Sequence, residues 1–252
     1  QNPLDKVICQ LRFPSILRID SDEPAAFQDR IRADYPLLNT RPQIDFAGNV
    51  PPEIAKLIAN SLPVALMQGS RVYNFISGDD KWTVTLTRDF IALTASHAYR
   101  RWEDFQRRLT TVLTAAVEIY RPAFFQRIGL RYQNVLRRSV LNLKDVPWSK
   151  LLQPHIAGEL TVPLPEGTIE RISAVVLFKL GDGAKVQMQH GLGLAEGTGE
   201  VGYVIDSDFF TDERTEVPNA LERLADFNRE ARHLFHWCIT RQLHDAMGPQ
   251  TL

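Results

Sequence analysis

Residues 71–95 read RVYNFISGDDKWTVTLTRDFIALTA and predict three consecutive β-strands. Within this stretch Trp82, Val84 and Leu86 alternate with threonines, and this period of two places apolar side chains on one face of a strand. The segment Gly78-Asp79-Asp80 is typical of a tight turn. Because short turns join antiparallel neighbours, the stretch predicts an antiparallel meander with one buried face.

A long amphipathic helix is expected directly after the meander. Residues 102–120 place apolar side chains at helical spacing along one side, and Pro122 prevents the helix from continuing. This apolar side is expected to pack on the buried face of the meander. Its members are Trp102, Phe105, Leu109, Val112, Leu113, Ala116 and Tyr120.

The remaining segments predict a similar order of elements in each half of the chain. The first half opens with a strand at 7–13 and a short helix that starts near Pro24, and residues 36–70 are expected to be mostly irregular, with a short helix at 54–62. The second half predicts strands at 125–136, 169–180, 185–194 and 201–209, a short helix at 147–156, and a last helix from Pro218 to Gly248.

Two short motifs recur in the same order and at nearly equal spacing. Leu11-Arg12-Phe13 is matched by Leu130-Arg131-Tyr132, and Asp104-Phe105-Gln106-Arg107 by Asp226-Phe227-Asn228-Arg229. Chance can produce matches this short, but their common order indicates an internal duplication. The sequence thus predicts an α+β fold of two β-α-β-β-β-α units, at 1–122 and 123–252. Antiparallel sheets carry the long helices on one face, and the units pack closely enough to form one domain.

Composition is that of an ordinary globular protein. The chain has 252 residues, enough to bury a large core without disulfides or metals. Its two cysteines, Cys9 and Cys238, lie in apolar surroundings, which predicts buried free thiols and a reducing, cytoplasmic location. No apolar run is long enough to span a membrane, and residues 1–5 do not resemble a signal peptide.

Several segments carry a resemblance to a known family. The opening motif Gln10-Leu11-Arg12-Phe13-Pro14 is similar to the start of a sporadically distributed bacterial family of about this length, and further matching segments are found at 99–105, 127–134 and 239–240. Members of that family have no assigned activity, so the resemblance implies no catalytic residue. Their patchy distribution implies an association with mobile or defence-related genes.

Charge is distributed unevenly along the chain. Residues 88–138 hold ten arginines, no lysine and four acids, whereas residues 191–230 hold ten acids and three arginines. Planar guanidinium groups favour carboxylate, phosphate or aromatic partners. The arginines can therefore pair with the acidic region, bind another protein or hold nucleic acid. The candidate basic surface comprises Arg100, Arg101, Arg107, Arg108, Arg127 and Arg131, with helical pairs expected between Glu103 and Arg107 and between Asp104 and Arg108.

Signals for catalysis are weak. Asp206 and Asp208 share a strand face and are the best candidates for a divalent metal, but a solvated strand end that runs into an acidic loop is the favoured interpretation. His233, His236 and His244 on the last helix lack the remaining pattern of a zinc site. The glycines of residues 191–202 predict a hairpin loop, because no helix follows them to bind phosphate.

The sequence favours a non-enzymatic binding or adaptor protein that acts in a complex with another protein or with a second copy of itself, without a cofactor or a membrane. A nucleic-acid-recognising component of a bacterial defence or mobile-element system is the first alternative, since the arginine-rich stretch could serve phosphates. A metal-dependent phosphoryl-transfer enzyme at Asp206 and Asp208 is the second.

Overall fold

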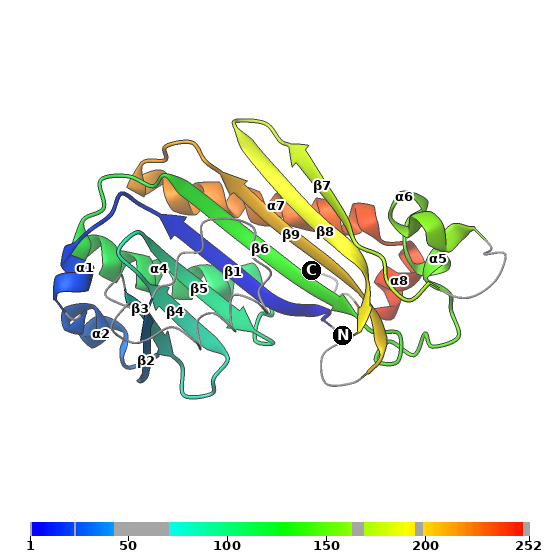
Figure 1. Cartoon of the computed structure of the whole chain (residues 1–252), viewed down its shortest axis with the longest axis horizontal. Helices are drawn as coiled ribbons and strands as arrows, with labels where there is room; N and C mark the ends of the chain where they lie inside the picture. The colour runs from blue at the N-terminus through cyan, green and yellow to red at the C-terminus, as the bar shows by residue number, and fades with distance from the viewer. Residues whose placement is uncertain (1, 23, 43–70, 163–168, 195–198, 249–252) are drawn as a thin grey trace.

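The computed structural model describes residues 2–22, 24–42, 71–162, 169–194 and 199–248. Their strands form one antiparallel sheet in the order β2-β3-β4-β5-β1-β6-β9-β8-β7 (Figure 1). The strands are β1 (Leu4–Arg12), β2 (Leu37–Pro42), β3 (Arg71–Ile76), β4 (Trp82–Leu86), β5 (Phe90–Ser96), β6 (Arg127–Leu136), β7 (Ala174–Lys179), β8 (Ala184–Leu194) and β9 (Val201–Thr211).

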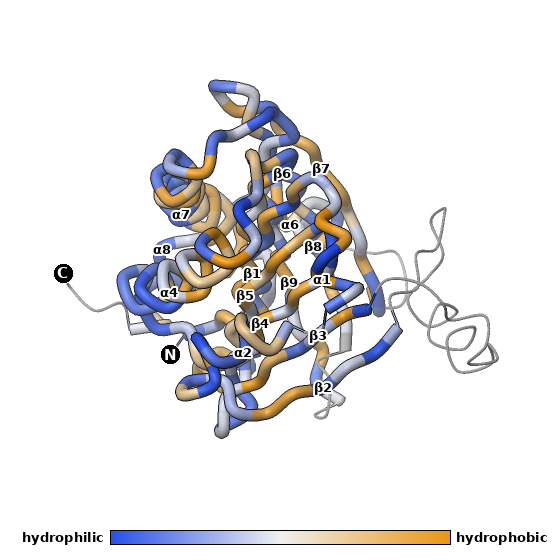
Figure 2. The backbone as a smooth tube through the Cα atoms, turned by 90° about the vertical axis from the view of Figure 1, so that its left-hand side faces the viewer, coloured by the Kyte–Doolittle hydropathy of each residue, from blue (hydrophilic) through white to orange (hydrophobic). Residues whose placement is uncertain are grey.

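One face of this sheet is covered by two long helices, α4 (Trp102–Tyr120) and α7 (Ala220–Cys238), as Figures 1 and 2 show from two directions. The sheet turns its apolar alternate residues toward them, among them Val84 and Leu130, which are fully buried. Phe105 and Phe227 anchor the two helices in this core, and the burial of Phe105 that the apolar stripe of 102–120 predicts is confirmed. The predicted α+β class with an antiparallel sheet is also confirmed.

The two halves of the chain meet at the centre of the sheet. β1 pairs with β6 in antiparallel register, with Cys9 opposite Leu130 and Arg12 opposite Arg127. Strands β2 to β5 extend the sheet on the β1 side, and β7 to β9 extend it on the β6 side. The sheets expected for the two units are therefore one continuous sheet.

Short helices complete the described chain. α1 (Arg18–Ser21) and α2 (Ala25–Ile31) follow β1, whereas α5 (Trp148–Leu151) and α6 (Pro154–Ala157) occupy the region predicted as one short helix. Phe27 and Ile31 of α2 are buried against the first-half core, as their spacing predicts. α8 (Arg241–Ala246) is the last helix described.

Two predictions about elements are wrong. Residues 37–42 were expected to be irregular but form β2, because all six residues pair with β3 despite a sequence without strict alternation. The last helix was expected to run unbroken to Gly248, but it stops at Cys238, and Ile239 is extended and bridges to Leu152. Thr240 then caps α8 by accepting a hydrogen bond from the backbone N–H of Leu243. The helix expected at 54–62 lies outside the described residues.

Both cysteines are buried and free, as predicted. Cys9 on β1 lies in the core under α4 and α7, and Cys238 packs in a second core around α5 and α8. Among the described helices, none combines the length and apolar character that crossing a membrane requires.

Candidate functional site

The sheet face opposite α4 and α7, here called the polar face, carries the candidate site. Residues of β6 and β9 alternate in direction, so Arg127 and Arg131 point to the same face as Asp206 and Asp208. The register places Arg131 opposite Asp208 and Gln133 opposite Asp206. Long side chains reach diagonal neighbours across such a pair of strands, and the arginines of β6 therefore meet carboxylates of β9.

Arg131 and Asp206 form a two-point ion pair. The Nε and Nη2 atoms of Arg131 donate to Oδ1 and Oδ2 of Asp206 at 2.7 and 2.6 Å, and the amide of Gln133 donates to the same carboxylate at 3.1 Å. The Asp206 side chain is only 10% exposed, whereas that of Arg131 is 45% exposed. The Asp206 carboxylate thus accepts three side-chain hydrogen bonds, and the guanidinium of Arg131 is the more exposed partner of the pair.

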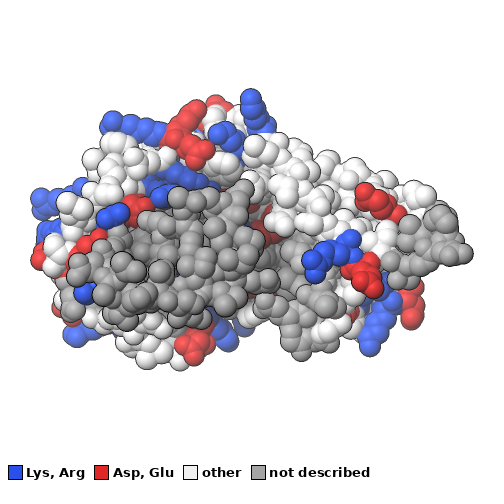
Figure 3. Space-filling model, in the orientation of Figure 1, with Lys and Arg blue, Asp and Glu red and all other residues white. Residues whose placement is uncertain are grey.

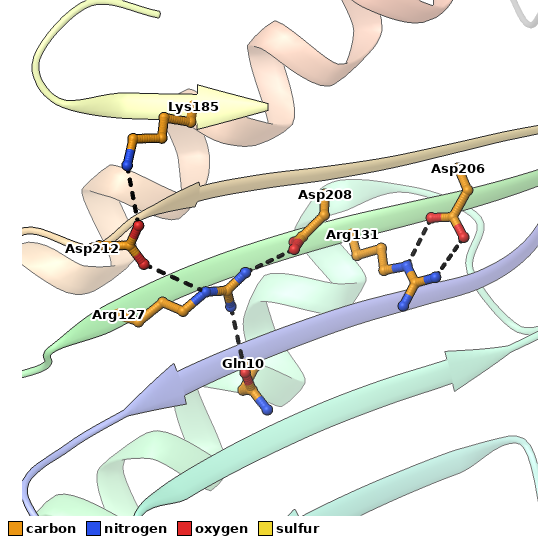
Figure 4. A network of polar contacts seen from close by, with 7 residues as sticks. All are labelled: Gln10, Arg127, Arg131, Lys185, Asp206, Asp208 and Asp212. Carbon is orange, nitrogen blue, oxygen red and sulfur yellow. Dashed lines mark hydrogen bonds and ion pairs between the residues drawn. The ribbon is translucent and has the colours of Figure 1, made fainter. Parts of the chain in front are cut away.

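Arg127 is the centre of a second group of contacts, drawn in Figure 4. Its Nη2 atom donates to Oδ2 of Asp208 at 2.7 Å, its Nε atom lies 3.8 Å from Oδ1 of Asp212, and its guanidinium stacks over the ring of Phe210. Gly129 leaves the space for this arrangement, because a Cβ added there would lie 2.6 Å from Nη1 of Arg127. A side chain at position 129 would therefore displace the guanidinium.

Two further residues close the group around Arg127. Gln10 on β1 accepts a hydrogen bond from Nη1 of Arg127 at 3.4 Å, and Lys185 on β8 places its ammonium 3.3 Å from Oδ2 of Asp212. Together with the Arg131–Asp206 pair, these contacts pair three basic side chains with three acidic ones. The six residues come from β6, β8 and β9 and from the position directly after β9. We call this set, with Gln10, the central network: Gln10, Arg127, Arg131, Lys185, Asp206, Asp208 and Asp212.

Two members of the central network, Asp208 and Arg131, have shifted pKa values. Burial raises the pKa of Asp208 above its ordinary value of 3.8, although Arg127 and Arg131 act in the opposite direction. A carboxyl with a raised folded-state pKa stabilises the fold most when protonated, and that contribution is lost as pH rises from its unfolded pKa through its folded pKa. The hydrogen bonds to Asp206 raise the pKa of Arg131 and keep it charged. Within the network, the pKa of Arg131 is thus raised by its hydrogen bonds and that of Asp208 by its burial.

The basic residues at the start of α4 lie on the other side of the sheet. Arg101 and Arg107 both donate to Asp104, and the guanidinium of Arg108 lies 4.7 Å from the ring centroid of Trp82. These contacts replace the expected pairs of Arg107 with Glu103 and of Arg108 with Asp104, because the i, i+3 geometry brings Arg107 to Asp104 and the indole ring attracts Arg108. Among the described residues no carboxylate pairs with Arg100.

The six arginines of the predicted basic surface therefore fall into two groups. Arg127 and Arg131 lie on the polar face, and Arg100, Arg101, Arg107 and Arg108 belong to the helix-covered side. Figure 3, in the orientation of Figure 1, shows both basic and acidic side chains among the described residues that are visible from this side. Of the three uses left open by the sequence, internal pairing with the acidic region is confirmed for Arg127 and Arg131.

The histidines of the last helix and the glycine-rich segment show no feature of a metal site in the described part of the chain. Within the described parts of the chain, no three His, Cys, Asp or Glu side chains gather in a metal-binding group. The rings of His236 and His244 are tilted against each other with centroids 4.9 Å apart, and burial lowers the pKa of His236. The glycine-rich segment joins β8 to β9 as a hairpin, as predicted, with residues 195–198 outside the described part.

Sequence reasoning missed Gln10, Gln133 and Lys185 as members of the site. Gln10 and Gln133 occupy strand positions that alternate with buried neighbours, a pattern that assigns them to the polar face. Their partners depend on the order β1-β6-β9-β8, which no local pattern reveals. Comparison of the chain with models of protein families, with curated proteins and with solved structures finds no match.

Proposed function

We propose that this chain is a non-enzymatic binding protein that acts in a complex with another protein. The observation that carries the proposal is the contrast between the centre of the sheet and its ends. Charged side chains at the centre are matched with one another, whereas apolar side chains on the outermost strands are exposed. Exposed apolar residues on a sheet edge are typical of a surface that receives another polypeptide.

The side chains best suited to catalysis are engaged elsewhere. Burial raises the pKa of Cys238 to about 12 and raises that of Cys9 as well, so neither thiol supplies a thiolate near neutral pH. A divalent ion at Asp206 and Asp208 would have to displace the guanidinium groups of Arg131 and Arg127. These contacts disfavour the phosphoryl-transfer hypothesis on chemical grounds.

The proposed docking strand for the partner is β2, at one end of the sheet. All six of its residues are exposed, and Leu37 and Leu38 are 48% and 47% exposed. Successive residues of a strand point to opposite faces, so one leucine lies on each side of the edge. Among the described residues only β3 pairs with β2. An extended partner segment could hydrogen-bond to the edge of β2 that faces away from β3 and cover both leucines.

A pull-down tests this proposal, with the tagged chain as bait after nuclease has removed any nucleic acid that was purified with it. The Leu37→Lys/Leu38→Lys variant should retain about tenfold less of a stoichiometric protein partner than the wild type, a change equal to about 1.4 kcal/mol. Leu17→Lys is the matched control, because Leu17 is 69% exposed and lies outside the strands. Equal retention by all three chains would reject β2 as the docking strand, and recovery of nucleic acid alone would reject the protein partner.

Recognition of nucleic acid remains the second candidate, and one observation favours it. At the start of α4, Arg101 and Arg107 share the single carboxylate of Asp104, and Arg100 has no acidic partner among the described residues. This leaves an excess of positive charge that a phosphate backbone could neutralise. The near-zero net charge of the chain argues against it as the main function.

We also propose that the two halves arose by duplication. Arg12 on β1 and Arg131 on β6 both lie on the polar face. Arg12 pairs with Asp89, directly before the adjacent strand β5, and Arg131 pairs with Asp206 on the adjacent strand β9. Phe105 and Phe227 occupy the long helices that close the two halves. An experimental structure whose halves superpose with Arg12 over Arg131 and Phe105 over Phe227 would support duplication.

A further inference from the structure

The sheet ends on its other side at β7, whose exposed side chains are nearly all apolar. Val175 and Leu177 are 61% and 58% exposed, and Val176, on the opposite face, is 37% exposed. β7 is the last strand in the order, and among the described residues only β8 pairs with it. This edge is separate from β2, so a contact made here does not depend on the partner proposed for β2.

The backbone of β7 shows which residues offer hydrogen bonds to a new strand. The N–H of Leu180 donates to the carbonyl of Ala184, so these two residues form a hydrogen-bonded pair. Counting back along β7 in the same register, every second residue is again in a bonded pair, and Val176, opposite Met188, is one of them. In an antiparallel ladder, hydrogen-bonded pairs alternate with pairs that are not bonded. Val176 and its even-numbered neighbours therefore turn their polar backbone groups toward β8, and Val175 and Leu177 turn theirs outward.

The usable edge is limited to β7 itself. Just before the strand, the chain passes so close over β8 that a Cβ added at Gly191 would collide with the carbonyl oxygen of Ile172. Glycine is therefore required at this crossing, where the N–H of Ile172 still donates to the carbonyl of Leu192 at 3.4 Å although regular pairing begins at Ala174. A docking strand can pair with little more than the segment Ala174–Lys179.

We propose that β7 pairs with β7 of a second copy of this chain, antiparallel and about a two-fold axis at Val176. In this register Val176 faces Val176 of the second copy, Val175 faces Leu177, and Ala174 faces Phe178. Every residue of the apolar segment then lies opposite another apolar residue. Lys179, the single charged residue of β7, falls beyond the paired segment and keeps its ammonium in water.

Backbone geometry leaves few other registers, because Val175 and Leu177 must face residues that also turn outward. Centring the axis on Val175 leaves Phe178 opposite Ile172, outside the strand. An axis at Leu177 places Lys179 opposite Val175. The register at Val176 alone pairs the apolar segment with itself. Such a two-fold contact is closed, and it yields dimers rather than fibres.

Cysteine cross-linking tests the dimer and its register together. Both native cysteines are buried, so a single exposed cysteine reports on the edge alone. At the proposed axis, the Cα atoms of the two copies at position 176 would lie about 4.5 Å apart, within the range of a disulfide. The Val176→Cys chain, mildly oxidised at micromolar concentration, should become mostly covalent dimer. Lys179→Cys should give at least tenfold less, since its equivalents lie about 20 Å apart along the strands.

The cysteine series distinguishes every competing arrangement. Preferential cross-linking of Val175→Cys or Leu177→Cys would overturn the register, and cross-linked species larger than dimers would overturn the closed contact. Light scattering on the wild-type chain should give twice the monomer mass, and Val176→Lys should restore the monomer. A wild-type monomer with no cross-link at position 176 would overturn the dimer and leave the proposed use of β2 intact.

Discussion

Replacing Phe105 or Phe227 by alanine is expected to lower the free energy of unfolding by about 3–5 kcal/mol. Both phenylalanines are almost fully buried in the layer between the sheet and its helices. Phe105 contacts the rings of Trp82, Tyr99 and Trp102 with centroids about 6 Å apart, so its loss removes packing from three aromatic neighbours. Equilibrium denaturation in urea measures the change.

The matched control for these substitutions is Thr114→Ala on the exposed side of α4. This change should alter the free energy of unfolding by no more than about 0.5 kcal/mol. A loss below about 1 kcal/mol for either phenylalanine would show that the helix faces are assigned wrongly.

Replacing Arg131 by alanine is expected to cost about 1–3 kcal/mol of stability. The substitution leaves the Asp206 carboxylate, only 10% exposed, with the amide of Gln133 as its remaining side-chain donor among the described residues. The expected loss is below the 3–5 kcal/mol typical of a fully buried pair, because Arg131 itself is half-exposed and water screens it.

Arg101→Ala provides the control for Arg131→Ala. Arg101 also donates twice to one carboxylate, that of Asp104, but water screens this exposed pair and its loss should cost clearly less than the loss of Arg131. The Arg131→Ala/Asp206→Ala double variant should be more stable than the sum of the single losses predicts. Equal losses for Arg131→Ala and Arg101→Ala would contradict the buried character of the Arg131 pair.

Local patterns were sufficient to predict most of the elements. The alternation at Trp82, Val84 and Leu86 predicts β4 and its buried face, and the stripe through Phe105 and Leu109 predicts α4. Such patterns report which side of an element is apolar, and a strand or long helix with one apolar side has few ways to pack.

Features that depend on distant contacts could not be predicted. β2 lacks alternation because both its faces are exposed, and α7 ends at Cys238 because Ile239 bridges to Leu152 of a remote segment. The pairing of Arg131 with Asp206 requires the register of β6 against β9, which is set by the whole sheet. The sequence predicted both residues as candidates for different sites, although each is the partner of the other.

The central claim is that Arg127 and Arg131 serve the carboxylates of β9 rather than phosphates. A filter-binding titration at about 150 mM salt, with single- and double-stranded DNA and RNA, tests it directly. We expect weak binding that changes little in the Arg127→Ala/Arg131→Ala variant, since Asp206 and Asp208 already occupy both guanidinium groups. Sub-micromolar binding that this variant abolishes, with a log–log salt slope of about −0.7 to −0.9 per phosphate contact, would contradict the claim.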